Sequence, residues 1–230
     1  EGSLKKLVIR RAKGLLIPYF IMEAIKFFGI LLLQWLREGT IDLTLEDLPS
    51  KIIPIFLATD PCISWFCFVL FAVNILYALI NMAVHGHYIL TAIIASGCSY
   101  IGYYFSNSPY WDFKIFRWDL VLFVIPFFAA GHLYHLYKDK IPKKLKYIAI
   151  IPAIIIWAAD LYFTDSFSIG FGMFDPYPLS AIGAICATFV MMMLYTALDK
   201  IPVLNNIMRF FGTNTLVVMC FATFVTDVMR

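Results

Sequence analysis

Charged residues are scarce in this chain of 230 residues. They make up 14% of it, whereas ordinary globular proteins contain about a quarter, and apolar residues make up 62% where about half is usual. This deficit excludes a soluble globular domain. The net charge of +3 is also too small to indicate a nucleic-acid partner, and the basic residues do not follow an aromatic-rich polar surface.

Paired cysteines and the motifs of soluble enzymes are missing as well. No CxxC pair, GxSxG, HExxH or GxxxxGK[ST] occurs, so neither a disulfide framework nor one of those catalytic classes is indicated. No cleavable signal peptide or initiator methionine precedes the first apolar stretch, which suggests a fragment. The single cysteines are expected to be small buried hydrophobes: Cys62, Cys67, Cys98, Cys186 and Cys220.

What the chain does have is seven apolar stretches of about twenty residues, each apolar all round. A helix rises about 1.5 Å per residue, so such a stretch crosses the roughly 30 Å hydrocarbon core of a bilayer. The alternating ten-residue segments of a membrane barrel are absent. We predict one all-α polytopic bundle over residues 1–230, with seven transmembrane helices at Gly14–Leu36, Cys62–Met82, Tyr88–Phe105, Asp119–Tyr137, Leu145–Phe163, Leu179–Leu198 and Ile207–Val225.

The basic residues predict the orientation of these spans. Twelve lie on the side of the amino terminus and four in the opposite loops, and cytoplasmic loops carry the excess of Lys and Arg. The amino-terminal side is therefore expected in the cytoplasm. The twelve are Lys5, Lys6, Arg10, Arg11, Lys13, Lys138, Lys140, Lys143, Lys144, Lys146, Lys200 and Arg209; the four are Arg37, Lys51, Lys114 and Arg117.

The long outer segment from Arg37 to Pro61 contains an apolar run, residues 52–57, that is too short to span and is broken by Pro54. It is expected at the interface or dipping into the bundle. Aromatic residues near the span ends fit the aromatic belts of a bilayer. Tyr110, Trp111 and Tyr177 could alternatively stack against a sugar ring.

Ionisable residues inside a membrane are costly and therefore candidates for function. Glu23 and Lys26 are three residues apart in the first span, so they share one helix face and could pair. They form either a neutralised structural pair or part of a polar cavity. Asp160, near the end of its span, is expected to be an interfacial carboxylate.

Four histidines occur as two close pairs, His85 with His87 and His132 with His135. Zinc needs three or four protein ligands, and no nearby Cys or carboxylate supplies a third, so we predict no metal site. A general-base role is chemically open to each of them because histidine titrates near neutrality. The basic segment 3–13 likewise has two interpretations, an orientation signal at anionic headgroups or a phosphate-binding patch.

Four local motifs, in this order, resemble those of the acyltransferase family 3 membrane proteins, particularly the fucose 4-O-acetylase-like branch. The first is a basic stretch, residues 5–13, leading into Leu15-Leu16-Ile17-Pro18-Tyr19. The others are Pro61 to Phe71, the run from Asp119 that ends in Phe127-Phe128-Ala129-Ala130-Gly131, and Phe210-Phe211-Gly212-Thr213-Asn214-Thr215-Leu216. Together they cover essentially the whole chain.

The resemblance implies transfer of an acyl group, commonly acetyl from acetyl-CoA, to a hydroxyl of a cell-envelope sugar or glycan, in a bacterial inner membrane. It implies no bound cofactor besides this donor. Arg10, Arg11 and Lys13 would bind the donor phosphates, although lysine lacks the bidentate fork of arginine. The substrate cavity would be formed by Glu23, Lys26, Trp65, Phe66 and Asn214.

Two features of the family have no counterpart here. Its first two spans, with the arginine and histidine of the opening helix, are expected to precede Glu1, and residues 217–223 lack the family's last-span histidine. The catalytic residues are therefore unknown, and an inactive relative is possible. The alternatives are a carrier for a small solute or glycan precursor, with Glu23, Lys26 and Asp160 as cavity charges, and a scaffold subunit.

Overall fold

The computed structural model describes residues 2–40, 43–44, 46–57, 65–108, 115–164, 172–199 and 201–215. These residues form helices and no strand, which confirms the all-α prediction. Six helices are long and apolar enough to cross a membrane: 4–38, 65–83, 88–107, 118–137, 143–163 and 179–198. The protein is thus an integral membrane protein, since such helices satisfy every internal backbone hydrogen bond within lipid.

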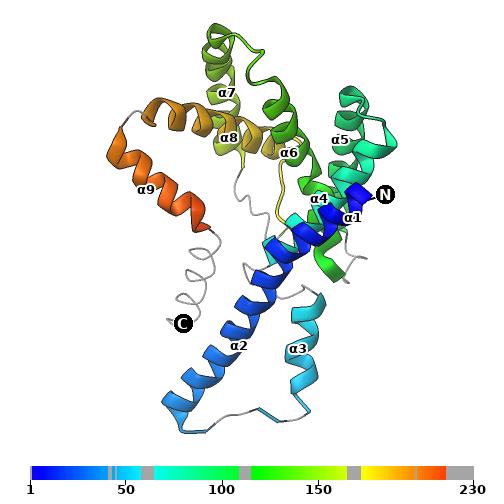
Figure 1. Cartoon of the computed structure of the whole chain (residues 1–230), viewed down its shortest axis with the longest axis vertical. Coiled ribbons are helices and arrows are strands. Elements are labelled where there is room, and N and C mark those ends of the chain that lie inside the picture. Colours follow the sequence, from blue (N-terminus) through cyan, green and yellow to red (C-terminus); the bar gives the residue numbers. More distant parts are fainter. Residues whose placement is uncertain are drawn as a thin grey trace.

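The first predicted span is longer than its sequence pattern indicated. Helix α1 (Gly2–Arg11), the π-helical turn η1 (Ala12–Leu16) and α2 (Ile17–Glu38) follow one another without interruption. They form the long diagonal rod in Figure 1, of which α1 and η1 pack against α4 (Trp65–Ala83). Pro18 lies just after the π turn and has no N–H to donate to the turn before it, and α2 is capped at its end by Gly39 with φ +71°.

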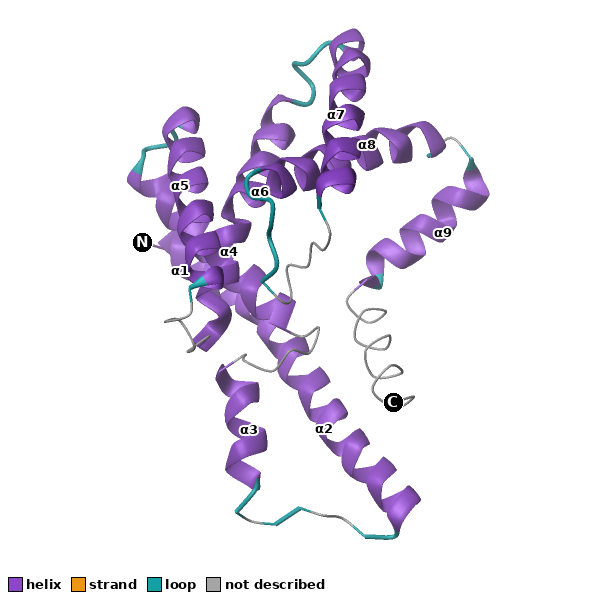
Figure 2. Ribbon diagram, turned by 180° about the vertical axis from the view of Figure 1, so that it is seen from behind, coloured by secondary structure: helices purple, strands orange, loops and turns teal. Residues whose placement is uncertain are grey.

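Helix α3 (Leu48–Leu57) accounts for the short apolar run before the second span, and Pro54 lies within it. The hydroxyl of Tyr19 donates to the backbone carbonyl of Ile55, and the rings of Phe20 and Phe56 are 5.6 Å apart. Since Phe20 lies about 27 Å along the helix from Glu38, α3 returns beside α2, as Figures 1 and 2 both show. Both placements predicted for this segment, at the interface or dipping into the bundle, stay predictions.

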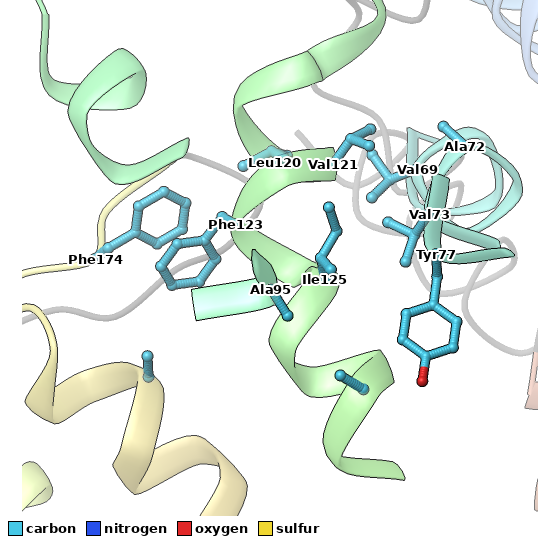
Figure 3. Packing of buried hydrophobic residues seen from close by; sticks show 12 residues of the cluster. Val69, Ala72, Val73, Tyr77, Ala95, Leu120, Val121, Phe123, Ile125 and Phe174 are labelled. Carbon is cyan, nitrogen blue, oxygen red and sulfur yellow. The ribbon is translucent and has the colours of Figure 1, made fainter. Parts of the chain in front are cut away.

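The core lies where α4, α5 (Tyr88–Asn107) and α6 (Trp118–Tyr137) meet. Val73, Leu120 and Phe123 are fully buried there (Figure 3). Small residues on one face of α5 let α6 approach closely: a Cβ on Gly102 would come within 2.5 Å of the backbone nitrogen of Phe123. In a membrane there is no hydrophobic driving force between helices, and the van der Waals packing that such close approach allows stabilises their association instead.

Helices α7 (Lys143–Phe163) and α8 (Leu179–Leu198) form a second closely packed pair, and they cross at a steep angle in Figures 1 and 2, also with a glycine at the contact. A Cβ on Gly183 would lie 2.4 Å from Oδ2 of Asp160. The segment before α8 ties this pair to α5 and α6, because Phe174 stacks on Phe123 and Tyr177 on Tyr103.

The seventh predicted span, Ile207–Val225, is seen only in part. Helix α9 (Pro202–Thr213) begins five residues before this span and covers its first seven residues, with Asn214 as the capping residue. Residues 216–230 lie outside the described part, so the remainder of that span stays a prediction.

Candidate functional site

The π-helical turn falls on the predicted donor-binding residues. Arg10 and Arg11 are the last two residues of α1, directly before η1, and Lys13 lies inside η1. A π turn holds an extra residue and is frequently found at functional sites, since it redirects the side chains around it. Arg10 and Lys13 are exposed, and Arg11 is partly buried against the bundle.

Arg11 carries an unsatisfied polar atom. Its Nε is buried and has no hydrogen-bond partner in the part of the chain that the structure describes. A buried donor without an acceptor costs about 1–3 kcal/mol, and more when the group is charged. An anionic ligand at this guanidinium would remove that cost.

Helix α4 carries a second unsatisfied polar atom. Oδ1 of Asn81 is buried and likewise has no partner among the described residues. Cys67, Asn74 and Asn81 are seven residues apart, so they lie on one face of α4, and Cys67 packs against Tyr19 of the first helix. Asn81 thus lies on the same face of α4 as Cys67, and its Oδ1 is a second unsatisfied polar atom within the described residues.

A tyrosine–histidine pair joins α4 to α6. The hydroxyl of Tyr77 lies 2.7 Å from Nδ1 of His132, and the two rings meet edge to face. Tyr77 is 6% exposed. The hydrogen bond fixes the ring orientation of His132, as a histidine used in proton transfer requires. The sequence offered no signal for this pair, whose members are 55 residues apart.

Glu23 is a buried carboxyl group of α2, at 2% exposed. Tyr19 and Lys26 lie on the same face, four residues before and three residues after it. A carboxyl group held away from solvent in an apolar helix is costly, so its burial is compatible with either interpretation given above. Its role as a cavity residue stays a prediction.

The other predicted cavity residues do not converge on one place. Trp65 and Phe66 begin α4 with their rings edge to face, 6.0 Å apart. Asn214 is half-buried and donates from Nδ2 to the carbonyl of Phe210 at the end of its own helix. Asp160 accepts a hydrogen bond from Thr164 and packs against Gly183. Tyr110 and Trp111 lie outside the described residues.

A buried ion pair lies at the other end of α6. Arg117 donates through Nε and Nη2 to the carboxylate of Asp119, at 3.3 and 3.2 Å, and Ser106 Oγ donates to the same carboxylate at 3.1 Å. Asp119 is fully buried and Arg117 is 5% exposed. The backbone of Arg117 is left-handed, with φ +47°. The sequence placed Arg117 in a loop, and only the fold shows its pairing.

A cavity of about 480 Å³ lies between α6, α7 and α8. Its walls include Phe127, Gly131, Tyr134, Ala149 and Phe189. None of Glu23, Lys26, Trp65, Phe66 or Asn214 lines it. Within the described residues, no three His, Cys, Asp or Glu side chains are grouped so that they could hold a metal ion.

These features define a polytopic membrane protein with polar groups set between its helices. The sequence model of a protein family, the acyltransferase domain of acyltransferase family 3, matches residues 1–230. The chain therefore belongs to this family. No curated protein and no solved structure matches the chain. The predicted family membership is thereby confirmed.

Proposed function

We propose that this chain is an O-acyltransferase that moves acetyl from acetyl-CoA to a hydroxyl of a cell-envelope sugar, in a bacterial inner membrane with its amino-terminal side in the cytoplasm. Membership of the acyltransferase family supports the reaction class. The motifs quoted above favour the fucose 4-O-acetylase-like branch. The distribution of Lys and Arg supports the orientation.

One observation carries the proposed donor site: the buried Nε of Arg11, beside a π turn in a chain of this family, has no acceptor among the residues that the structure describes. The phosphates of a CoA thioester are anionic acceptors, and guanidinium groups bind phosphate through paired hydrogen bonds. Arg10 and Lys13 are exposed beside it and add positive charge. On the predicted orientation, all three are at the side where the donor is found.

The proposed reaction is an exchange of esters. The sugar oxygen attacks the thioester carbonyl carbon, an oxygen ester forms, the carbon–sulfur bond breaks and CoA leaves as the thiol after taking up a proton. The hydroxyl proton must pass to a base. His132 is compatible with this role because Tyr77 orients it, yet no described contact places a hydroxyl substrate beside it, so the base is not assigned.

The test compares membranes from cells that carry the gene with membranes from a deletion strain. Both are incubated with acetyl-labelled acetyl-CoA and their own envelope glycans. We expect label in glycan only with the gene, and release of that label by mild alkali, as an ester requires. Absence of gene-dependent label would contradict the proposal. Solute uptake that falls in Glu23→Gln, without any acetyl transfer, would favour the carrier instead.

A further inference from the structure

The cavity between α6, α7 and α8 is chemically unlike the proposed donor and acceptor sites. Of its walls, Tyr134, Cys186 and Thr188 carry polar side-chain atoms, and the hydroxyl of Thr188 is already bonded to the carbonyl of Ala184 in its own helix. A sugar would lose its hydrogen bonds to water there without replacement. An apolar chain would lose none, so the cavity suits a hydrocarbon chain.

One end of the cavity lies next to a strongly basic turn. Tyr134 of the wall precedes Lys138 by one helical turn, and Ala149 of the wall follows Lys146 by three residues. Between residues 138 and 146 the chain contains five lysines and one aspartate. Lys146 donates to the carbonyl of Lys138 and so closes the turn, while Lys140, Lys143 and Lys144 are exposed.

We propose that this cavity binds an anionic lipid of the bilayer, with one acyl chain between α6, α7 and α8 and its phosphate at the lysines of residues 138–146. Charge complementarity selects this occupant, because a zwitterionic lipid gains little from a turn with this excess of lysine. Basic pockets between membrane helices bind anionic headgroups in this manner. The inference does not depend on acyl transfer.

Gly131 gives a direct way to fill the cavity. It lies in the wall, and a Cβ placed on it meets nothing within 4 Å, so a larger side chain can enter without moving the helix. Gly97 of α5 is a matched control, since it too is exposed with nothing within 4 Å and does not line the cavity. Gly131→Leu and Gly97→Leu thus differ chiefly in location.

The experiment titrates the purified chain in detergent with dioleoyl phosphatidylglycerol or dioleoyl phosphatidylcholine, which share their acyl chains, and counts bound lipid by native mass spectrometry. We expect at least tenfold tighter binding of the anionic lipid, lost in Gly131→Leu and kept in Gly97→Leu. Replacing Lys138, Lys140 and Lys144 by Gln should abolish the preference, whereas the same change at Lys5, Lys6 and Lys51 should not. Equal binding of the two lipids would overturn the proposal.

Cys186 provides a second measurement on the unaltered chain. It lines the cavity as a free thiol, and Cys98 of α5 is a free thiol elsewhere. Bound phosphatidylglycerol should slow alkylation of Cys186 by N-ethylmaleimide at least threefold and leave Cys98 unchanged. If a long-chain acyl-CoA protects Cys186 while phosphatidylglycerol does not, the cavity belongs to the acyl donor and the lipid proposal is wrong.

Discussion

The ring of Phe174 lies parallel to that of Phe123, with centroids 3.6 Å apart and planes 9° from parallel. Both side chains are fully buried (Figure 3). Close by, the hydroxyl of Tyr103 donates to Asp175 at 2.7 Å. Phe174 and Asp175 precede α8, and Tyr103 and Phe123 belong to α5 and α6. These contacts attach the pair α7–α8 to the rest of the bundle.

We predict that Phe174→Ala weakens this attachment. Truncating a buried phenylalanine typically costs about 3–5 kcal/mol, through lost transfer energy and the cavity left behind. The purified variant should aggregate at a clearly lower temperature in a detergent melt. Tyr162→Ala is the control, since Tyr162 is 82% exposed. Equal melting of Phe174→Ala and the wild type would show that the stacked pair does not hold the two parts together.

Two glycines of α5 give a sharper comparison. In Gly102→Ala the new Cβ would come within 2.5 Å of Phe123 N and 2.6 Å of the carbonyl oxygen of Asp119, both of which are backbone atoms that cannot rotate away. Helices α5 and α6 must then separate, and the protein should lose stability. Gly97→Ala meets nothing within 4 Å and should be neutral or stabilising by up to about 1 kcal/mol.

The measurement is the fraction of each variant that stays monodisperse after heating in detergent. A drop for Gly102→Ala with no drop for Gly97→Ala is the expected pattern. If both variants stayed monodisperse to the same extent, Gly102 would not lie in a close contact between α5 and α6, and this account would be wrong.

A third prediction concerns the ion pair of Arg117 and Asp119. Asp119→Ala leaves the guanidinium buried without its carboxylate, and breaking a buried pair costs about 3–5 kcal/mol. Replacing both partners, by Arg117→Met with Asp119→Leu, should recover much of this loss because no buried charge remains. Asp199→Ala is the control at an exposed carboxylate. Chemical unfolding of the four proteins in mixed micelles measures the differences.

A double variant less stable than Asp119→Ala would contradict this account. It would indicate that the two side chains have a further role in shaping the segment before α6, where Phe116 and Arg117 both have left-handed backbones.

Much of the fold could be predicted from the sequence because lipid imposes a simple rule of length and hydropathy. The span Leu179–Leu198 was predicted with the bounds of α8, since Pro178 and Asp199 flank its apolar run. The first span was predicted to begin at Gly14, because Arg10, Arg11 and Lys13 end the apolar pattern although the helix continues through them.

The sites depended on contacts that no local pattern contains. Tyr77 and His132 occupy ordinary positions on two apolar helices, and their hydrogen bond follows only from how α4 packs on α6. The π turn was not predicted either, although Gly14 within it and Pro18 just after it weaken the α-helix at this point. For Arg10, Arg11 and Lys13 the resemblance provided the prediction, and the unsatisfied Nε of Arg11 adds independent support.

The last prediction tests that atom. If Arg11 binds a donor phosphate, Arg11→Gln removes a charged hydrogen bond of about 1.5–3 kcal/mol, so the KM for acetyl-CoA should rise roughly tenfold or more. Arg11→Lys keeps the charge but loses the bidentate fork of arginine, so its KM for acetyl-CoA should lie between those of the wild type and Arg11→Gln. Arg209→Gln is the matched control, an exposed arginine of α9 on the same predicted side.

Initial rates of labelled acetyl transfer, measured over a range of acetyl-CoA concentrations, distinguish binding from a structural effect. A donor-binding role raises KM for acetyl-CoA and leaves the KM for the acceptor unchanged. A purely structural role would instead lower the amount of folded protein and the maximal rate, with KM unaltered. If Arg11→Gln behaved like Arg209→Gln in both parameters, the donor phosphates would have to bind elsewhere, and the buried Nε would be an unsatisfied atom without a ligand.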